Sequence, residues 1–368
     1  MRLAIIGSSI GQRFLPQKAK ELGVETLCFS CEEGAITKED VDYFYHISVS
    51  DFDNILRICK DMNIDGIVSN ASNFCADTVN YVGEKLGLHT NPFALGQKIK
   101  DKFYVRQVTN NIPSLTPVRI EYFNGNPPAK YPCVIKPVVG GGKKGVSFAN
   151  NIEEFQKSVD YAKSSSNERI IIEEFASGKE MSIETLSYEG KHYVIQITDK
   201  EVSGPPHFVE IGHHQPAAIS EDVKKKIENV VPKILSNIGF QNGAAHIEMK
   251  RAENEDLYLI EVNPRGGGDE ISNQLVYLST GFDYVKAMIE VALGMYKHQP
   301  ITSVNHSGIL YLCEQTRHRA PFILGDEEPV WLFERVINKT DITESIGNWD
   351  RAAYIVYRND SRVTDINF

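Results

Sequence analysis

Two acidic side chains, Glu248 and Glu261, lie near the ends of two short apolar runs, residues 244–249 and 257–262. Both runs mix aliphatic and β-branched residues, and the polar residues 250–256 between them predict a hairpin loop. Folding back at that loop would bring the two carboxylates face to face. Asn263 adds an amide oxygen, and oxygen ligands of this kind suit Mg²⁺, which takes its other ligands from phosphates and water. The sequence predicts a magnesium site; the alternative is a hairpin with solvated acidic ends.

A second chemical signal is a glycine-rich segment with cations around it. Residues 140–145 contain four glycines and two lysines, so the backbone can approach phosphates closely and point free amide groups at them. The segment is not a Walker loop, because no G-K-[ST] stands at the required spacing. Lys136 ends an apolar strand just upstream, and Lys102 would add a cation from another element. The alternative is a hairpin tip that binds nothing.

Acidic residues follow the next predicted strand. The run 170–175 ends in Glu173, Glu174 and Phe175, where a carboxylate or a backbone carbonyl could accept a hydrogen bond from an adenine amino group. Glu180 precedes another predicted strand, 181–186, and a carboxylate is a good acceptor for ribose hydroxyls. The alternative is an acidic strand edge that prevents pairing with other chains.

Composition limits the class of protein. The chain has 368 residues, 42% of them hydrophobic and 24% charged, which is typical of a globular protein with two or three domains. The net charge of −10 argues against general binding to nucleic acids or anionic membranes. No apolar run approaches the roughly 20 residues of a spanning helix, and residues 1–7 predict a first strand rather than a signal peptide. The single C-x-x-C, Cys28 and Cys31, lacks partners for a zinc site, so we expect reduced thiols and a cytoplasmic location.

The order of the elements predicts three regions. Residues 1–95 alternate strands and helices, among them helices 11–22, 52–62 and 78–86, and this rhythm predicts a parallel sheet with helices on its faces. Gly7 and Gly11 form only a G-x-x-x-G, which is weak evidence for a dinucleotide site. Residues 96–305 begin with a predicted helix, 100–108, and carry the chemical signals. Residues 306–368 predict a small β-rich segment.

Taken in order, these signals resemble the ATP-grasp superfamily over about residues 90–295. The resemblance implies a mixed α/β and α+β fold: a Rossmann-like pre-ATP-grasp domain with a parallel sheet (1–95), an ATP-grasp domain of two subdomains (96–305) with a mobile lid at about 112–185, and a C-terminal segment (306–368) packed on it. It also implies a reaction, in which a substrate carboxylate attacks the γ-phosphate of ATP and a nucleophile, most often an amine, captures the acyl phosphate.

The resemblance also implies a role for each matching residue. Lys102 and Lys136 would contact the phosphates of ATP, and a closing segment over them would contain Gly140, Gly141, Gly142, Lys143 and Gly145. Adenine would contact Glu173, Glu174 and Phe175, and ribose would contact Glu180. Two magnesium ions (or Mn²⁺ in their place) would bind to Glu248, Glu261 and Asn263, and Arg265 would contact the transferring phosphoryl group. Lys136 and Arg265 would then be catalytic. These assignments agree with the physics of phosphoryl transfer, which depends on positioning and charge neutralisation.

Residues 204–216, which include His207, His213 and His214, resemble a stretch beside the acceptor pocket of L-amino-acid ligases and carnosine-synthase-like enzymes. That resemblance places His213 and His214 at the substrate, with His213 orienting or deprotonating the amine. Residues 266–271 resemble the extension of the metal motif in the same enzymes; there, Gly267 and Gly268 would leave room for substrate, and Asp269 could accept a hydrogen bond from an α-ammonium group. Ordinary loop histidines are the alternative, and the role of His246 stays open.

The function that we expect is an ATP-dependent carboxylate–amine ligase that releases ADP and phosphate. Its partners would be a small carboxylate, such as an amino acid, and an amine, with neither nucleic acid nor membrane involved; a homodimer is common in this superfamily. Two alternatives stay open: a carboxylase or ligase of the purine-pathway type, and a noncatalytic ATP-binding regulator.

Overall fold

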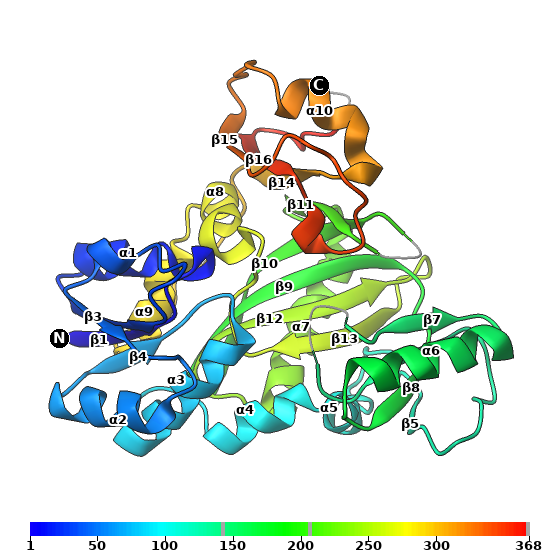
Figure 1. Ribbon diagram of the computed structural model, residues 1–368, viewed down its shortest axis with the longest axis horizontal. Helices are drawn as coiled ribbons and strands as arrows, with labels where there is room; N and C mark the ends of the chain where they lie inside the picture. The colour runs from blue at the N-terminus through cyan, green and yellow to red at the C-terminus, as the bar shows by residue number, and fades with distance from the viewer. Residues whose placement is uncertain (141–143, 205–207, 366–368) are drawn as a thin grey trace.

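The computed structural model describes residues 1–140, 144–204 and 208–365, and this part of the chain forms three sheets. In Figure 1 the N-terminal parallel sheet lies on the left and a large antiparallel sheet crosses the middle. A small sheet lies on the right, and the C-terminal strands are at the top. The mixed α/β and α+β fold expected from the sequence is confirmed.

The N-terminal sheet is parallel, with the strand order β3-β2-β1-β4. Its apolar strands alternate with helices, as the sequence predicts. The helix expected at 11–22 begins later, because residues 10–12 form a separate single turn and Pro16 suits the first turn of a helix. The elements are β1 (Arg2–Ile6), η1 (Ile10–Gln12), α1 (Leu15–Glu21), β2 (Glu25–Ser30), η2 (Lys38–Asp40), β3 (Tyr43–His46), α2 (Phe52–Asp61), β4 (Gly66–Val68) and α3 (Asn73–Leu86).

One face of this sheet is covered by a helix from a distant part of the chain. Helix α9 (Tyr284–Ala292) packs on α1 and β4 and shares an apolar cluster with Leu3 and Ile5 of β1. At the start of β4, a Cβ on Gly66 would lie 2.7 Å from the carbonyl oxygen of Ala292, so helix and strand are in close contact. Residues 1–95 therefore share their core with a later segment. That segment also contains η3 (Ile271–Leu275) and α8 (Val276–Thr280).

The large sheet is antiparallel, with the order β13-β12-β9-β10-β11-β14-β16-β15. The predicted hairpin is its β12-β13 pair. The C-terminal segment extends this same sheet, because β14 pairs with β11. The strands are β9 (Lys179–Tyr188), β10 (Lys191–Val202), β11 (Glu210–Gln215), β12 (Gly243–Arg251), β13 (Leu257–Asn263), β14 (His306–Leu312), β15 (Leu332–Ile337) and β16 (Ala353–Asn359); η4 (Glu314–Arg319), α10 (Ala320–Ile323) and η5 (Asn348–Asp350) lie between the last of them.

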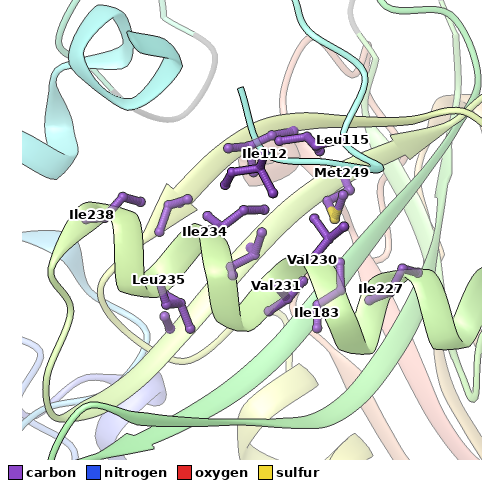
Figure 2. Packing of buried hydrophobic residues seen from close by; sticks show 14 of the residues in the cluster. Ile112, Leu115, Ile183, Ile227, Val230, Val231, Ile234, Leu235, Ile238 and Met249 are labelled. Carbon is purple, nitrogen blue, oxygen red and sulfur yellow. The ribbon is translucent and has the colours of Figure 1, made fainter. Parts of the chain in front are cut away.

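Helix α7 (Glu221–Ile238) covers the apolar face of the large sheet, as Figure 2 shows. The Ser220 hydroxyl caps its first turn by accepting from the backbone amide of Val223, and Gly239, with φ of +88°, ends it. The helix buries aliphatic residues at helical spacing, and Ile183 of β9 and Met249 of β12 meet them from the sheet. Each such side chain contributes about 1.5–3 kcal/mol when fully buried. The opposite face of these strands is thereby left for polar residues.

The small sheet is antiparallel, with the order β5-β8-β6-β7. It ends at residue 174, whereas residues 179–185, which the expected lid of 112–185 includes, belong to β9 of the large sheet. The elements are β5 (Ile120–Tyr122), β6 (Cys133–Pro137), β7 (Ser147–Ala149), α6 (Ile152–Ser165) and β8 (Ile170–Glu174).

Two helices, α4 (Phe93–Lys100) and α5 (Lys102–Thr109), lead to the small sheet in place of the one helix expected at 100–108. The helix is interrupted at Asp101, because the Asp101 carboxylate accepts hydrogen bonds from the backbone amides of Phe103 and Tyr104 and so caps α5. This cap places Lys102 at the first position of α5.

The six cysteines all lie in the described residues and are free thiols. Cys28 is buried and Cys31 is exposed, and burial raises the pKa of Cys28 to about 11. No helix in the described part of the chain has the length and apolar content needed to cross a membrane.

Candidate active site

The polar face of the large sheet carries the predicted metal carboxylates. Glu248 of β12 and Glu261 of β13 are register partners, as the hairpin predicts, and each keeps about a quarter of its side chain exposed (26% and 28%). Asn263 pairs with His246 on the same two strands. The two carboxylates and an amide therefore lie together at a place that solvent can reach. This donor set fits Mg²⁺, which prefers few protein oxygens and keeps room for water and phosphate.

Neighbouring groups already contact these candidate ligands. Lys102 Nζ lies 3.1 Å from Glu261 Oε1, so a predicted phosphate ligand and a predicted metal ligand are adjacent. The Asn263 side-chain oxygen accepts a 2.6 Å hydrogen bond from Asn73 at the start of α3, which brings the N-terminal domain to the edge of the site.

A buried ammonium that sequence reasoning missed lies beside Glu248. Lys200 of β10 is 8% exposed, and its Nζ lies 2.8 Å from Glu210 Oε1 and 3.3 Å from Glu248 Oε1. Burial alone would lower the pKa of Lys200, but the two carboxylates outweigh it and raise that pKa. In the same way, burial would raise the pKa of Glu248, while Lys200 and His246 hold it below its ordinary value. Lys200 therefore keeps the candidate metal carboxylate ionised.

The predicted nucleotide lysine, Lys136, lies in a buried ion cluster. It pairs with Glu173 of β8, and Arg106 Nε of α5 lies 3.0 Å from Glu173 Oε1; all three residues are buried. Burial would raise the pKa of Glu173, but Arg106 and Lys136 outweigh it and lower that pKa. The Glu173 carboxylate is thus already paired, and its contact with adenine stays a prediction. Arg106 was missed, although it lies four residues after Lys102 and so on the same face of α5.

The glycine-rich segment follows β6. Gly140 has φ of +156° and Gly145 has φ of +74°, which are backbone conformations that other residues rarely adopt. A Cβ on Gly145 would also lie 3.0 Å from Pro137 Cγ. The Gly140 carbonyl accepts a 2.7 Å hydrogen bond from Lys102 Nζ, so the segment lies beside a predicted phosphate ligand. The predicted contacts of Gly141, Gly142 and Lys143 fall outside the described residues, as does His207.

The predicted adenine and ribose residues lie where the small and large sheets meet. Lys250 of β12 joins two of them: its Nζ lies 3.4 Å from Glu180 Oε1 and 4.9 Å from the ring centre of Phe175. Glu174 is exposed at the end of β8. The structure therefore brings Phe175 and Glu180 together, and their nucleotide contacts stay predictions.

A second cluster surrounds His213 of β11, which is fully buried. Its Nε2 lies 3.4 Å from Glu210 Oε2 and 3.4 Å from Asp269 Oδ2. Burial would lower the pKa of His213, but Asp269 and Glu210 outweigh it and raise that pKa. Arg351, from the C-terminal segment, donates to both Asp269 oxygens at 2.7 and 2.9 Å and stacks 3.7 Å from the ring centre of Tyr311.

This His213 cluster has the composition of a metal site, since one ligand atom each of Glu210, His213 and Asp269 lies within 4.8 Å of the others. Two side-chain cations compete with that interpretation, because Arg351 holds Asp269 and Lys200 holds Glu210. Against burial, which raises it, His213 and Arg351 lower the pKa of Asp269 to about 2. The cluster is therefore charge-compensated; Asp269 is already paired with Arg351 and His213, and its predicted contact with a substrate ammonium group stays a prediction.

The structure separates His214 from the His213 cluster, and its predicted contact with substrate stays a prediction. Consecutive residues of a strand point to opposite faces, so the ring of His214 lies away from that of His213. Its Nδ1 shares a 2.7 Å hydrogen bond with the Tyr357 hydroxyl, and its Nε2 lies 3.0 Å from Glu201 Oε1. Burial lowers the pKa of His214, so this ring is a neutral core residue.

Arg265 and the two glycines occupy the segment after β13. Arg265 Nη1 donates to the Gly266 carbonyl at 2.9 Å, and the side chain borders a small cavity of about 50 Å³ between the N-terminal sheet and the start of β12. The predicted role of Arg265 at the phosphoryl group stays a prediction. Gly268 has open space around it, whereas Gly267 lies in tight contact with Glu184 and His246.

Comparison with known proteins identifies this arrangement. Residues 129–274 match the family model described as an ATP-grasp domain. The chain contains an ATP-grasp domain. The matched range of this ATP-grasp domain includes Lys136, Glu173, Glu248, Glu261 and Arg265, whereas Lys102 precedes it and Arg351 follows it.

Two kinds of enzyme are among the relatives that match this chain. Alanine–anticapsin ligase of Bacillus subtilis (strain 168) is 26% identical over 245 residues, which are 59% of this chain and 51% of that protein. Formate-dependent phosphoribosylglycinamide formyltransferase of Methanococcus vannielii is 24% identical over 285 residues, 72% of this chain and 70% of that protein. The chain thus spans about half the length of the alanine–anticapsin ligases that it matches.

A solved structure resembles the chain over nearly its whole length. The crystal structure of L-amino acid ligase from Bacillus licheniformis has a TM-score of 0.80, with 21% identity, and the match covers 98% of this chain and 93% of that one. At this identity the likeness establishes the fold. The N-terminal sheet, the ATP-grasp domain and the C-terminal strands therefore form one arrangement that is shared with this ligase.

Proposed function

We propose that the chain is an ATP- and Mg²⁺-dependent ligase that activates a small carboxylate, such as an amino acid, as an acyl phosphate and couples it to an amine. One observation carries the proposal: Lys102, Glu261, Glu248, Lys200 and Glu210 form a continuous series on one face of the large sheet. Register pairing places Glu261 opposite Glu248, and ion pairs of 2.8–3.3 Å connect the others. A predicted phosphate ligand, the two predicted metal carboxylates and the His213 cluster are thereby adjacent.

The residues have roles that follow from their charges. Lys102 and Lys136 would neutralise the phosphates of ATP. Lys136 and Arg106 share the single Glu173 carboxylate, so this cluster keeps a net positive charge. Glu248, Glu261 and Asn263 would hold magnesium, which supplies charge neutralisation at the transferring phosphate. The substrate carboxylate oxygen would bond to the γ-phosphorus as ADP leaves.

The second step needs a proton acceptor near the amine. The amine nitrogen would bond to the acyl carbon, phosphate would leave, and the nitrogen would lose a proton. His213 suits this role, because Asp269 and Glu210 raise its pKa and would stabilise the imidazolium that forms. Arg351 holds Asp269 in place and would thereby help to orient His213.

The two kinds of relative suggest different carboxylate substrates. The alanine–anticapsin ligases and the L-amino acid ligase support an amino acid as the substrate. The formyltransferases are matched over a larger share of both chains, which favours formate and a phosphoribosyl amine as the second candidate. Both candidates use the same activation chemistry.

An assay of product release tests the proposal. Purified protein with ATP, Mg²⁺ and pairs of amino acids should release ADP and phosphate, while formate with phosphoribosylglycinamide serves as the second arm. Glu261→Gln should abolish turnover in whichever arm is active, and Glu253→Gln, at an exposed position in the loop after β12, is the matched control. Release of AMP and pyrophosphate would contradict the acyl-phosphate route. ATP binding without any turnover would favour the noncatalytic regulator.

Two further properties belong to the proposal. Small-molecule substrates and free thiols agree with a cytoplasmic enzyme, which cell fractionation would test. A homodimer would give twice the mass of 41.3 kDa in light scattering.

A further inference from the structure

A buried pair of residues, Glu184 of β9 and His246 of β12, lies directly behind the candidate metal carboxylate. The two are register partners, and His246 Nδ1 shares a short hydrogen bond with Glu184 Oε1. The other ring nitrogen, Nε2, lies 3.4 Å from Glu248 Oε1. Glu184 is fully buried and His246 is 3% exposed. The ring therefore connects a buried carboxylate to one that solvent can reach.

Glu184 also holds the segment that follows the metal motif. Its second oxygen, Oε2, accepts a 2.9 Å hydrogen bond from the backbone amide of Gly267. A Cβ on Gly267 would lie 2.7 Å from Glu184 Oε1 and 2.8 Å from His246 Nδ1, so only glycine lets the backbone come this close. The Glu184 carboxylate thus connects β9, β12 and the chain after β13.

Core stability alone is a weak reason for such a pair. Burying a carboxylate is costly, and replacing a buried ion pair with apolar residues is often neutral or stabilising. The direction of the ring is informative instead, because its free nitrogen faces Glu248 and not a backbone group. A buried carboxylate that fixes a histidine ring, which in turn contacts a metal-binding group, is the usual way in which outer residues orient a metal site.

We propose that Glu184 and His246 are positioning residues that orient Glu248 for Mg²⁺. The inference rests on the proposed function, because it takes Glu248 as a metal ligand. Glu184 would fix the plane of the His246 ring, and the ring would fix the rotamer of the Glu248 side chain. Losing such an outer contact typically weakens metal affinity by about 10- to 100-fold.

The test measures Mg²⁺ dependence without turnover. The full chain is titrated with Mg²⁺ in the presence of a non-hydrolysable ATP analogue, and the half-saturating Mg²⁺ concentration is read from the rise in melting temperature and from calorimetry. Glu184→Gln keeps the volume and removes the charge, and His246→Gln removes the ring. Thr185→Val is the matched control, because Thr185 lies next to Glu184 and bonds the Ala245 carbonyl at 3.0 Å without contacting Glu248.

We expect both pair variants to need about 10- to 100-fold more Mg²⁺ than the wild type. Thr185→Val should lower the melting temperature but keep the wild-type Mg²⁺ dependence, as a purely structural loss would. Folded pair variants with an unchanged half-saturating concentration would overturn the proposal while leaving the ligase intact. Failure of both variants to fold would show a structural role and overturn it as well. If the wild type binds the analogue equally well without Mg²⁺, the result would instead contradict the metal site of the proposed function.

Discussion

Replacing Lys200 with methionine tests whether the candidate site is held by charge. The substitution keeps the aliphatic stem but removes the ammonium that lies 2.8 Å from Glu210 and 3.3 Å from Glu248. At an effective dielectric constant of about 20, these two attractions amount to about 6 and 5 kcal/mol. Desolvation of the buried Lys200 and Glu210 and of the partly buried Glu248 offsets several kcal/mol of each. We therefore expect a loss of about 3–5 kcal/mol in the free energy of unfolding, the range for removing one partner of a buried pair.

The assay is denaturant unfolding of Lys200→Met followed by circular dichroism, with and without Mg²⁺ and an ATP analogue. The difference from wild type should shrink when both are present, because a divalent cation beside Glu248 would restore the missing positive charge. Lys286→Met is the matched control: Lys286 is 41% exposed and 4.0 Å from Glu290, so its loss should cost less than about 1 kcal/mol. A Lys200 variant as stable as this control would refute the reasoning.

Three further predictions address the core, the His213 cluster and the segment after the metal motif. Ile234→Ala, in the buried face of α7, should cost about 2–5 kcal/mol in denaturant unfolding by leaving a cavity; a cost below about 1 kcal/mol would contradict the packing. Asp269 has its pKa lowered to about 2, so it contributes stability that is present above its unfolded pKa of about 3.9 and is lost as the pH falls toward 2. Arg351→Gln should therefore move acid unfolding to higher pH, and an unchanged acid midpoint would argue against the pairing. Gly267→Ala should cost about 1–3 kcal/mol in thermal or denaturant unfolding, because its Cβ would meet Glu184 Oε1 at 2.7 Å; wild-type stability would show that the backbone moves freely there.

Local features of the site could be predicted from the sequence. Glu248 and Glu261 were expected to face each other because a hairpin with a short polar loop fixes its own register, and they do. Lys136 was expected at the end of a strand because a short apolar run precedes it, and β6 ends one residue later. The break between α4 and α5 escaped prediction because one side chain, Asp101, competes with helix continuation by capping the next helix.

Residues that act through distant pairing could not be found in this way. Lys200 becomes important only because β10 lies two strands from β12 in the sheet, and Arg351 only because the C-terminal segment returns to Asp269. Arg106 could have been recognised from its spacing of four residues after Lys102. His214 was assigned by its neighbour His213, although the alternation of side chains along a strand separates the two rings.

Helix α9 has a consequence for how the polypeptide can be divided. A boundary drawn after residue 95 looks natural from the sequence, but α9 supplies apolar cover for Leu3 and Ile5 on one side of the N-terminal sheet. A fragment that ended at residue 95 would expose this apolar surface and would aggregate instead of folding as an independent domain. If recombination exchanged the first 95 residues for those of another protein, α9 would have to be exchanged with them to keep the packing. Substitutions in the two segments are therefore constrained by each other.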